Sequence, residues 1–218
     1  GTYGDAGVLS IVLAAGNGQR FADAGYVQIK PLLPMPDGRP LIAWVCERLP
    51  AGRQVIVARD ADRVTLMPHT HGMVVHWLDS ATDGPLSSAR AVCDLIAAGD
   101  ELLITYCDTL LPDGAQAFIE TARHARAATA MVVFPSADPR YGYWDGARTV
   151  EKQVISPWAV SGLFYFQRGH IFTDRASQVY PFGTGLPSLM NAETYCYQSD
   201  VIDVGAPADY EALCVPVS

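Results

Sequence analysis

The sequence predicts a single α/β domain with three layers, in which helices cover both faces of a mostly parallel β-sheet. Three observations favour this fold. The chain has 218 residues, which suits one ordinary domain. Half of its residues are apolar and 17% are charged, so the chain can bury a sizeable core. Short apolar runs rich in β-formers alternate with helical patterns, as in parallel sheets joined by crossover helices.

The alternation is regular up to Pro135. Five apolar runs are predicted strands: residues 8–15, 54–59, 73–78, 101–107 and 130–134. Four helical patterns stand between them: residues 41–49, 60–67, 86–98 and 115–127. Pro40 opens the first of these helices and Pro50 closes it, whereas Ser87 or Ser88 could cap the third.

The pattern changes after Pro135. Residues 141–146 are a turn-rich aromatic stretch, and residues 181–187 are a predicted loop rich in Gly and Pro. The other predicted elements are strands at 149–155, 159–166, 194–198 and 201–204 and helices at 168–180 and 208–214. We expect this half to add a small lobe to the sheet, and residues 1–7 to form an N-terminal tail.

Charge and cysteine usage exclude several classes of protein. The net charge is −8 and there is no basic stripe, which disfavours a nucleic-acid partner. No apolar run is long enough to span a bilayer, and there is no signal-peptide pattern. The cysteines are odd in number and form no CxxC motif: Cys46, Cys93, Cys107, Cys196 and Cys214. We therefore expect reduced thiols in a cytoplasmic protein without a membrane partner.

A glycine loop follows the first predicted strand. Residues 13–18 are Leu13, Ala14, Ala15, Gly16, Asn17 and Gly18. Two glycines at this place let backbone N–H groups approach an anion closely, although small residues could also simply make a tight turn. The loop is not a dinucleotide fingerprint, because Phe21 takes the third glycine position, and no Gly-Lys-Ser/Thr follows to make a Walker A motif.

Two cations accompany the loop. Arg20 follows it at once, and Lys30 follows about ten residues later, with Pro31 restraining its backbone. Each could be an ordinary surface cation. Together they suit a triphosphate, because Arg binds phosphate oxygens bidentately and Lys acts as a point charge.

Two carboxylates stand at predicted strand ends. Asp108 ends the fourth strand, and Asp203 lies in the run Val-Ile-Asp-Val-Gly at 201–205, after another short strand. Carboxylates at the carboxyl ends of parallel strands project into the crevice where α/β sheets bind ligands. Either could instead be a helix cap or turn residue. As a pair, two hard oxygen ligands suit Mg²⁺.

The chain resembles the sugar-1-phosphate nucleotidylyltransferases. The resemblance is carried by Leu-Ala-Ala-Gly-Asn-Gly-Gln-Arg-Phe at 13–21, Ala-Gly-Tyr at 24–26, Lys-Pro-Leu-Leu at 30–33 and Gly-Arg-Pro-Leu-Ile at 38–42. It extends from Val8 to Leu213 and is closest to the small capsule-associated subgroup, which activates sugar phosphates or similar compounds for cell-surface polysaccharides. It implies a Rossmann-like, GT-A-like fold with one nucleotidyltransferase domain at 8–218, a nucleotide-binding part at 8–135 and an acceptor-binding lobe at 136–200.

The resemblance assigns roles to the charged residues. Asp108 matches the first metal aspartate of the family, with Cys107 in place of the usual glycine before it. Asp203 matches the second, in a motif where Ala206 replaces a threonine and Val201 a frequent tryptophan. These two aspartates are therefore the expected ligands of Mg²⁺, the implied cofactor.

The loop at 79–86 is similar to the base-recognition segment of the family, in which Gly84 would present its backbone to the base. Asp79 stands where some thymidylyltransferases have a base-reading glutamine. An ionised carboxylate only accepts hydrogen bonds, so Asp79 would favour a base with an exocyclic amine such as cytosine. It could equally be a solvated loop residue.

Four residues are similar to acceptor-site elements of the family: Gly142, Glu151, Lys152 and Gly162. Glu151 would accept from an acceptor hydroxyl or amine, and Lys152 would neutralise the acceptor phosphate. Glycine at 162 would permit a close approach. As a bare sequence pattern, Glu151 and Lys152 could also be an exposed pair on a strand.

The resemblance implies transfer of a nucleoside monophosphate from an NTP (CTP, dTTP, UTP or GTP) to a small phosphorylated acceptor, with release of pyrophosphate. Lys30 would stabilise the α-phosphoryl group, while Arg20 and the amides near Gly16 and Gly18 would hold the pyrophosphate. A non-sugar acceptor, such as phosphocholine, a phosphonate or a phosphorylated amino acid amide, remains open, because Tyr143, Trp144 and Trp158 could wall a small cation. A nucleotide-binding module without catalysis is a further alternative. The chain could form a homodimer.

Overall fold

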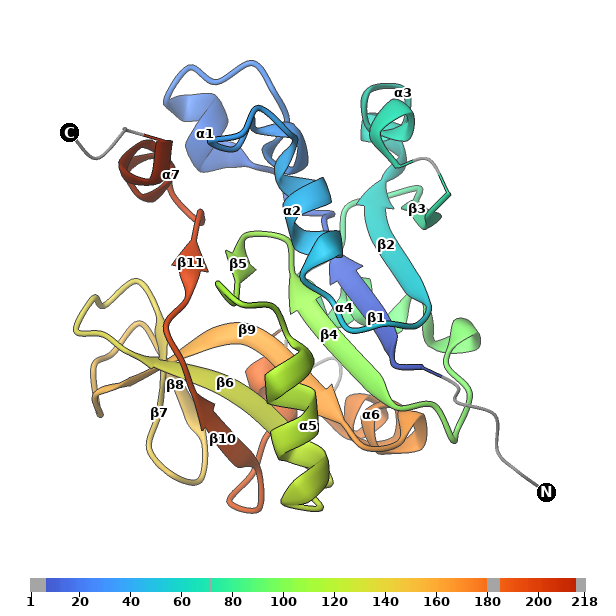
Figure 1. Ribbon diagram of the computed structural model, residues 1–218, viewed down its shortest axis with the longest axis vertical. Helices are drawn as coiled ribbons and strands as arrows, with labels where there is room; N and C mark the ends of the chain where they lie inside the picture. The colour runs from blue at the N-terminus through green and yellow to red at the C-terminus, as the bar shows by residue number, and fades with distance from the viewer. Residues whose placement is uncertain (1–6, 71, 180–184, 215–218) are drawn as a thin grey trace.

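The centre of the molecule is a twisted mixed sheet, which has nine strands within the described part of the chain (Figure 1). The computed structural model describes residues 7–70, 72–179 and 185–214. Most of the predicted tail, His71, Tyr180 and residues 181–184 of the predicted loop lie outside these ranges. The seven strands of the main path lie in the order β10-β6-β9-β4-β1-β2-β3. In chain order they are β1 (Leu9–Leu13), β2 (Gln54–Arg59), β3 (Val74–Leu78), β4 (Leu102–Tyr106), β6 (Thr129–Pro135), β9 (Trp158–Phe166) and β10 (Tyr195–Gln198).

Strand direction follows the expected pattern. β1 pairs in parallel with β2 and β4, β2 pairs in parallel with β3, and β10 pairs in parallel with β6. The long strand β9 reverses direction and lies antiparallel between β4 and β6. A hairpin of β7 (Gly142–Trp144) and β8 (Thr149–Glu151) joins β9 through Tyr143 and Ala159. The predicted α/β fold with a mostly parallel sheet is confirmed.

Helices cover both faces of the sheet (Figure 1). Along β1, Ile11 faces a core shared with α4 (Pro85–Arg90) and α6 (Gly169–Val179), whereas Val12 faces the core on the side of α2 (Leu41–Glu47). This alternation follows from the two-residue period of a strand, and both faces are apolar because both are covered. The helices are α1 (Gln19–Asp23), α2 (Leu41–Glu47), α3 (Arg63–Leu66), α4 (Pro85–Arg90), α5 (Gln116–His124), α6 (Gly169–Val179) and α7 (Pro207–Cys214). Short 3₁₀ helices are η1 (Lys30–Leu32), η2 (Asp60–Asp62), η3 (Met67–His69), η4 (Cys93–Leu95) and η5 (Leu186–Leu189).

Several predicted elements need correction. The helix predicted at 86–98 begins one residue earlier, at Pro85, and ends at Arg90, followed by η4. Its N-cap is Gly84 and it has no side-chain cap, so neither serine caps it. The strand predicted at 149–155 ends at Glu151, because Lys152 has φ 56°, a left-handed conformation that a strand cannot continue.

A second, two-stranded sheet was not predicted as such. β5 (Thr109–Leu110) pairs antiparallel with β11 (Ile202–Asp203). Two residues are too few to show a period in the sequence, so β5 had no signal of its own. The pairing brings the chain after β4 alongside the chain before α7.

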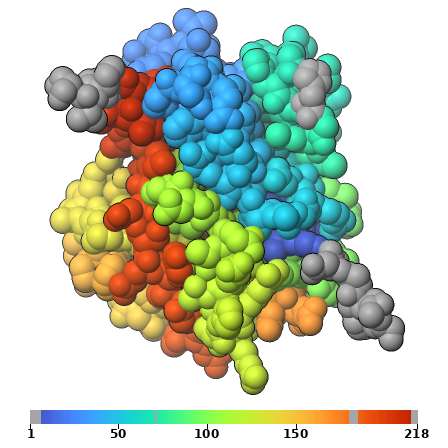
Figure 2. Space-filling model, in the orientation of Figure 1, coloured from blue at the N-terminus to red at the C-terminus, as the bar shows by residue number. Residues whose placement is uncertain are grey.

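The C-terminal helix packs against the segment after the glycine loop. Figure 2 shows the red C-terminal segment against the blue N-terminal one. The rings of Phe21, Tyr26 and Tyr210 contact one another edge to face, with centroids 5.2–6.0 Å apart. Within the described ranges, no helix has both the length and the apolar character needed to cross a bilayer. All five cysteines are free thiols.

Candidate active site

Two adjoining cavities open at the carboxyl ends of β1 and β4. The larger has a volume of about 590 Å³ and the smaller about 430 Å³. Pro85, Tyr106 and Asp108 line both, so the cavities form one cleft in two compartments. This is the position where α/β sheets bind ligands, and each volume suits a small molecule.

The smaller cavity is built around the glycine loop. The loop leaves the sheet after the Ala14 N–H donates to the Val57 carbonyl oxygen at 2.8 Å. Gly18, with φ 62°, then turns the chain into α1. No atom lies within 4 Å of the place where a Cβ on Gly16 would stand, so the backbone there is open. The predicted nucleotide-binding residues that line this cavity are Leu13, Ala14, Ala15, Gly16, Gly18 and Gly84.

Lys30 lies at the boundary between loop and carboxylates. It begins η1, its ammonium lies 5.6 Å from the centroid of the Phe21 ring, and its Nζ donates to Asp108 Oδ2 at 2.6 Å. Burial alone would lower the pKa of Lys30, but the charge of Asp108, its hydrogen bond to Lys30 and the charge of Asp203 outweigh the burial, and the pKa is raised. Lys30 is therefore a permanent cation aimed at the carboxylate end of the cleft.

Asp108 and Asp203 converge on one place. The small sheet pairs Thr109 with Asp203, and the Val204 N–H donates to the Asp108 carbonyl oxygen at 2.8 Å. A Cβ on Gly205 would stand 2.9 Å from Asp203 Oδ1 and 3.7 Å from Asp108 Oδ2. Both carboxylates thus lie within 4 Å of a single point, although their positions in the sequence are far apart.

The environment of this pair favours a cation. Burial raises the pKa of Asp203, and the neighbouring charge of Asp108 raises it further, against hydrogen bonds from Tyr141 and from the Gly205 N–H. Two adjacent carboxylates repel each other unless a positive charge lies between or beside them. Hard carboxylate oxygens are the ligands that Mg²⁺ prefers, so the donor set fits that ion. Across the described ranges, no cluster of three or more His, Cys, Asp or Glu side chains could hold a metal. An ion here would complete its coordination with water or substrate oxygens.

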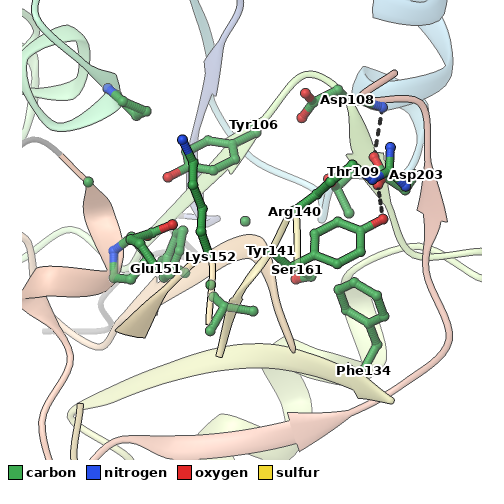
Figure 3. Close-up of a pocket in the computed structure, with 18 of the residues that line it drawn as sticks. Tyr106, Asp108, Thr109, Phe134, Arg140, Tyr141, Glu151, Lys152, Ser161 and Asp203 are labelled. Carbon is green, nitrogen blue, oxygen red and sulfur yellow. Dashed lines mark hydrogen bonds between the residues drawn. The ribbon is translucent and has the colours of Figure 1, made fainter. Parts of the chain in front are cut away.

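Tyr141 contacts the second carboxylate directly. Its hydroxyl donates to Asp203 Oδ2, and the Gly205 N–H donates to Asp203 Oδ1 at 2.7 Å (Figure 3). The tyrosine ring packs edge to face on Phe134, with centroids 5.0 Å apart. Burial and the carboxylate of Asp203 raise the pKa of Tyr141, so the hydroxyl keeps its proton.

The predicted acceptor residues all line the larger cavity. Gly142, Glu151 and Lys152 come from the β7–β8 hairpin, and Gly162 comes from β9. A Cβ on Gly142 would stand 3.1 Å from Glu151 Oε1, so a side chain there would crowd the glutamate. The Lys152 N–H donates to the Tyr141 carbonyl oxygen at 3.0 Å, which holds the hairpin end beside the cleft.

Gly162 permits the closest contact in this wall. Its φ is 98°, and a Cβ there would stand 2.5 Å from Cδ2 of Tyr106. The tyrosine ring can therefore approach the backbone of β9 closely. Tyr106 lines both cavities, and sequence reasoning missed it, although its position at the end of β4, two residues before Asp108, places it at the cleft.

Two predicted residues lie elsewhere than expected. Arg20 is exposed on α1 and lines the larger cavity, with the carboxylates, and not the smaller one. Asp79 is exposed just after β3 and does not line the smaller cavity, in which Thr82 and Asp83 take part instead. The Thr82 hydroxyl lies 2.7 Å from that of Ser88, which also lines the cavity.

The prediction that Tyr143, Trp144 and Trp158 form an aromatic wall for a cationic acceptor was wrong. Tyr143 and Trp144 are buried, and Trp158 packs against the core, so none of the three lines the larger cavity. Period-two alternation in β7 and β9 cannot show which face of a strand meets a cavity and which meets the core. The aromatic residues that do line it are Tyr106, Phe134, Tyr141 and Phe164.

Solved structures with the same fold are numerous. The chain matches a protein from Bacillus anthracis assigned as a glucose-1-phosphate thymidylyltransferase, with a TM-score of 0.75, 16% identity and coverage of 95% of this chain and 94% of that one. It matches the UTP-bound UDP-glucose pyrophosphorylase from Acinetobacter baumannii with a TM-score of 0.73, 16% identity and coverage of 95% and 92%. It matches a nucleoside-diphosphate-sugar pyrophosphorylase from Vibrio cholerae with a TM-score of 0.70, 18% identity and coverage of 94% and 99%.

No curated protein sequence matches the chain. The family model described as the MobA-like NTP transferase domain matches residues 10–177, a span that contains the glycine loop, Lys30, Asp108 and the acceptor hairpin. The chain belongs to this family of NTP transferases and is a nucleotidyltransferase.

Proposed function

We propose that the protein is a Mg²⁺-dependent nucleotidylyltransferase that joins a nucleoside monophosphate from an NTP to a small phosphorylated acceptor of the sugar 1-phosphate class and releases pyrophosphate. The observation that carries the proposal is the convergence of Asp108, Asp203 and Lys30 at the junction of two cavities. A transfer between two substrates needs two compartments that meet at the reacting atoms. The similar solved structures include a UTP-bound pyrophosphorylase of sugar nucleotides, which supports this class of substrates.

The smaller cavity is the proposed nucleotide site. The open backbone at Gly16 and Gly18 lets amide N–H groups approach phosphate oxygens, and the loop at 81–85 faces it across the cavity. The carboxylate that this loop brings to the cavity is that of Asp83, whose Oδ1 accepts a hydrogen bond from the Ser87 hydroxyl. Asp79 does not line this cavity, so Asp79 could read a base only if the base extended beyond the cavity.

The larger cavity is the proposed acceptor site. Arg20 and Lys152 bring two cations to it, which suits an acceptor phosphate, and Glu151 offers an acceptor for a hydroxyl or amine. Phe134, Tyr141 and Phe164 add apolar surface. A wall that mixes few charges with aromatic rings suits a small polar molecule such as a sugar phosphate.

Asp108 and Asp203 would hold Mg²⁺. When bound, the ion neutralises phosphate charge and orients the reacting oxygens. The residues of the chain provide the remaining charge. Lys30 pairs with Asp108 at 2.6 Å and lines the nucleotide cavity, so its ammonium can pass from the carboxylate to an α-phosphate oxygen as the triphosphate enters.

The reaction needs no general base from the protein. A phosphate oxygen of the acceptor, already anionic, attacks the α-phosphorus in line. The new P–O bond forms as the bond to the β-phosphate oxygen breaks, and pyrophosphate leaves with the electron pair. Amides of the glycine loop stabilise the leaving charge, and Lys30 stabilises the charge on the α-phosphoryl oxygens.

A matrix of CTP, UTP, GTP, ATP and dTTP against phosphorylated acceptors tests the proposal, with pyrophosphate release as the signal. The acceptors include sugar 1-phosphates, phosphocholine, a phosphonate and a phosphorylated amino acid amide. Release that requires both an NTP and one acceptor supports transfer, and the acceptor identifies its class. NTP binding without release in any pair would instead indicate a nucleotide-binding module without catalysis.

A further inference from the structure

The hydroxyl of Tyr141 holds one carboxylate of the proposed ion site. Its O–H donates to Asp203 Oδ2, while the Gly205 N–H donates to Oδ1 at 2.7 Å. With both oxygens engaged from opposite sides, the carboxylate cannot rotate about its Cβ–Cγ bond without breaking a hydrogen bond. The open lone pairs of its two oxygens therefore point in fixed directions.

The tyrosine is itself held rigidly. Its ring stands edge to face on Phe134 at an interplanar angle of 82°, and the Arg140 guanidinium carbon lies 5.6 Å from the ring centroid. Arg140 is clamped in turn, because it donates to Asp138 at 2.7 Å and to Asp209 of α7 at 2.9 and 3.2 Å. These contacts place the hydroxyl without help from Asp203.

Tyr141 also links two parts of the site. It precedes Gly142 at the start of the acceptor hairpin, and its carbonyl oxygen accepts from the Lys152 N–H. Asp203 lies in β11, and Figure 3 shows the Tyr141 hydroxyl pointing toward its carboxylate. Arg140 and Tyr141 thus tie the hairpin to the segment that carries Asp203 and Asp209.

We propose that Tyr141 is a positioning residue that orients Asp203 for the divalent ion. The inference rests on the proposed function, because it takes Asp203 as a ligand. Groups that hydrogen-bond to metal ligands set their orientation, and their loss typically weakens metal binding by about ten- to a hundredfold.

Binding of Mn²⁺ in place of Mg²⁺ tests the inference without a catalytic readout. Free Mn²⁺ is measured by electron paramagnetic resonance as MnCl₂ is added to the wild-type protein, Asp203→Asn, Tyr141→Phe and a control, Tyr165→Phe. The control loses the same kind of bond, because the Tyr165 hydroxyl donates to Glu101 Oε1 at 2.7 Å at the far end of β4. Phenylalanine at 141 keeps the ring packing on Phe134, so the variant is expected to fold.

We expect Tyr141→Phe to raise the Mn²⁺ dissociation constant by about tenfold, with the free energy of unfolding near that of Tyr165→Phe. Tyr165→Phe should bind Mn²⁺ as the wild type does. If Asp203→Asn weakens binding and Tyr141→Phe does not, the positioning role is wrong while the proposed ion site stands. If Asp203→Asn and the wild type do not differ, the ion site fails, and the inference fails with it.

Discussion

The close approach of Gly162 to Tyr106 offers a sharp test of the geometry, through Gly162→Ala. Gly162 has φ 98°, and an added Cβ would stand 2.5 Å from Cδ2 and 3.1 Å from Cγ of Tyr106. Carbon atoms in contact normally lie about 3.5–4.0 Å apart, so the methyl group overlaps the ring by about 1 Å. Neither partner can move easily, because β9 is paired on both sides and Tyr106 packs edge to face on Phe164.

Two costs contribute to the expected loss of stability. A non-glycine residue in this backbone region costs about 1–3 kcal/mol. Overpacking by one methyl group in a rigid wall costs about 1–3 kcal/mol more. We therefore expect Gly162→Ala to lower the free energy of unfolding by about 2–6 kcal/mol.

Gly146→Ala is the matched control, because Gly146 has φ 103° but an added Cβ would meet no atom within 4 Å. It should show only the backbone cost. Urea unfolding of the two variants, followed by circular dichroism, gives the difference, which we expect to be about 1–3 kcal/mol. Because Tyr106 lines both cavities, Gly162→Ala should also raise the KM for the acceptor. Equal destabilisation by the two substitutions would refute the contact between Gly162 and the ring.

Three further predictions concern charge. Lys30→Ala should lose on the order of a hundredfold in kcat with unchanged circular dichroism, because one electrostatic group at the transferred phosphoryl is removed; near-normal turnover would contradict its role. Asp108→Asn should shift the Mg²⁺ activation curve to higher concentration, so an unshifted curve would count against the ligand assignment. Burial raises the pKa of Cys107 to about 12 and that of Cys46 to about 11, so both stay protonated at pH 8. Mass spectrometry should find them unalkylated by iodoacetamide until urea unfolds the chain, whereas rapid alkylation of the folded protein would contradict their burial.

Much of the fold could be predicted because its signals are local. Strand β2 has the predicted bounds, since an apolar run between polar residues marks both of its ends. The glycine loop could be placed because small residues follow a buried strand within a few positions. Arg20 was assigned to the triphosphate from its proximity in sequence, yet the direction of α1 carries it to the larger cavity. The direction of a helix after a glycine turn depends on how the helix packs in the folded chain, and a short sequence motif does not contain that information.

Long-range contacts account for what could not be predicted. The hydrogen bond from Tyr141 to Asp203 joins residues 62 positions apart, and the type of neither residue indicates which residue it will contact. The convergence of Asp108 with Asp203 depends on β5 and β11, which pair through two residues each. Strand-end position indicated both aspartates as site residues, whereas only the folded chain shows the carboxylates within 4 Å of one point.

The central claim is that the α-phosphoryl group moves to the acceptor, and isotope transfer tests it most directly. The active NTP and acceptor pair is incubated with the enzyme twice, once with the NTP labelled by ³²P at the α-phosphate and once at the γ-phosphate. The account predicts that α-label enters the acceptor product and that γ-label leaves as pyrophosphate. Label from the γ-position in the acceptor, or released as inorganic phosphate, would contradict it.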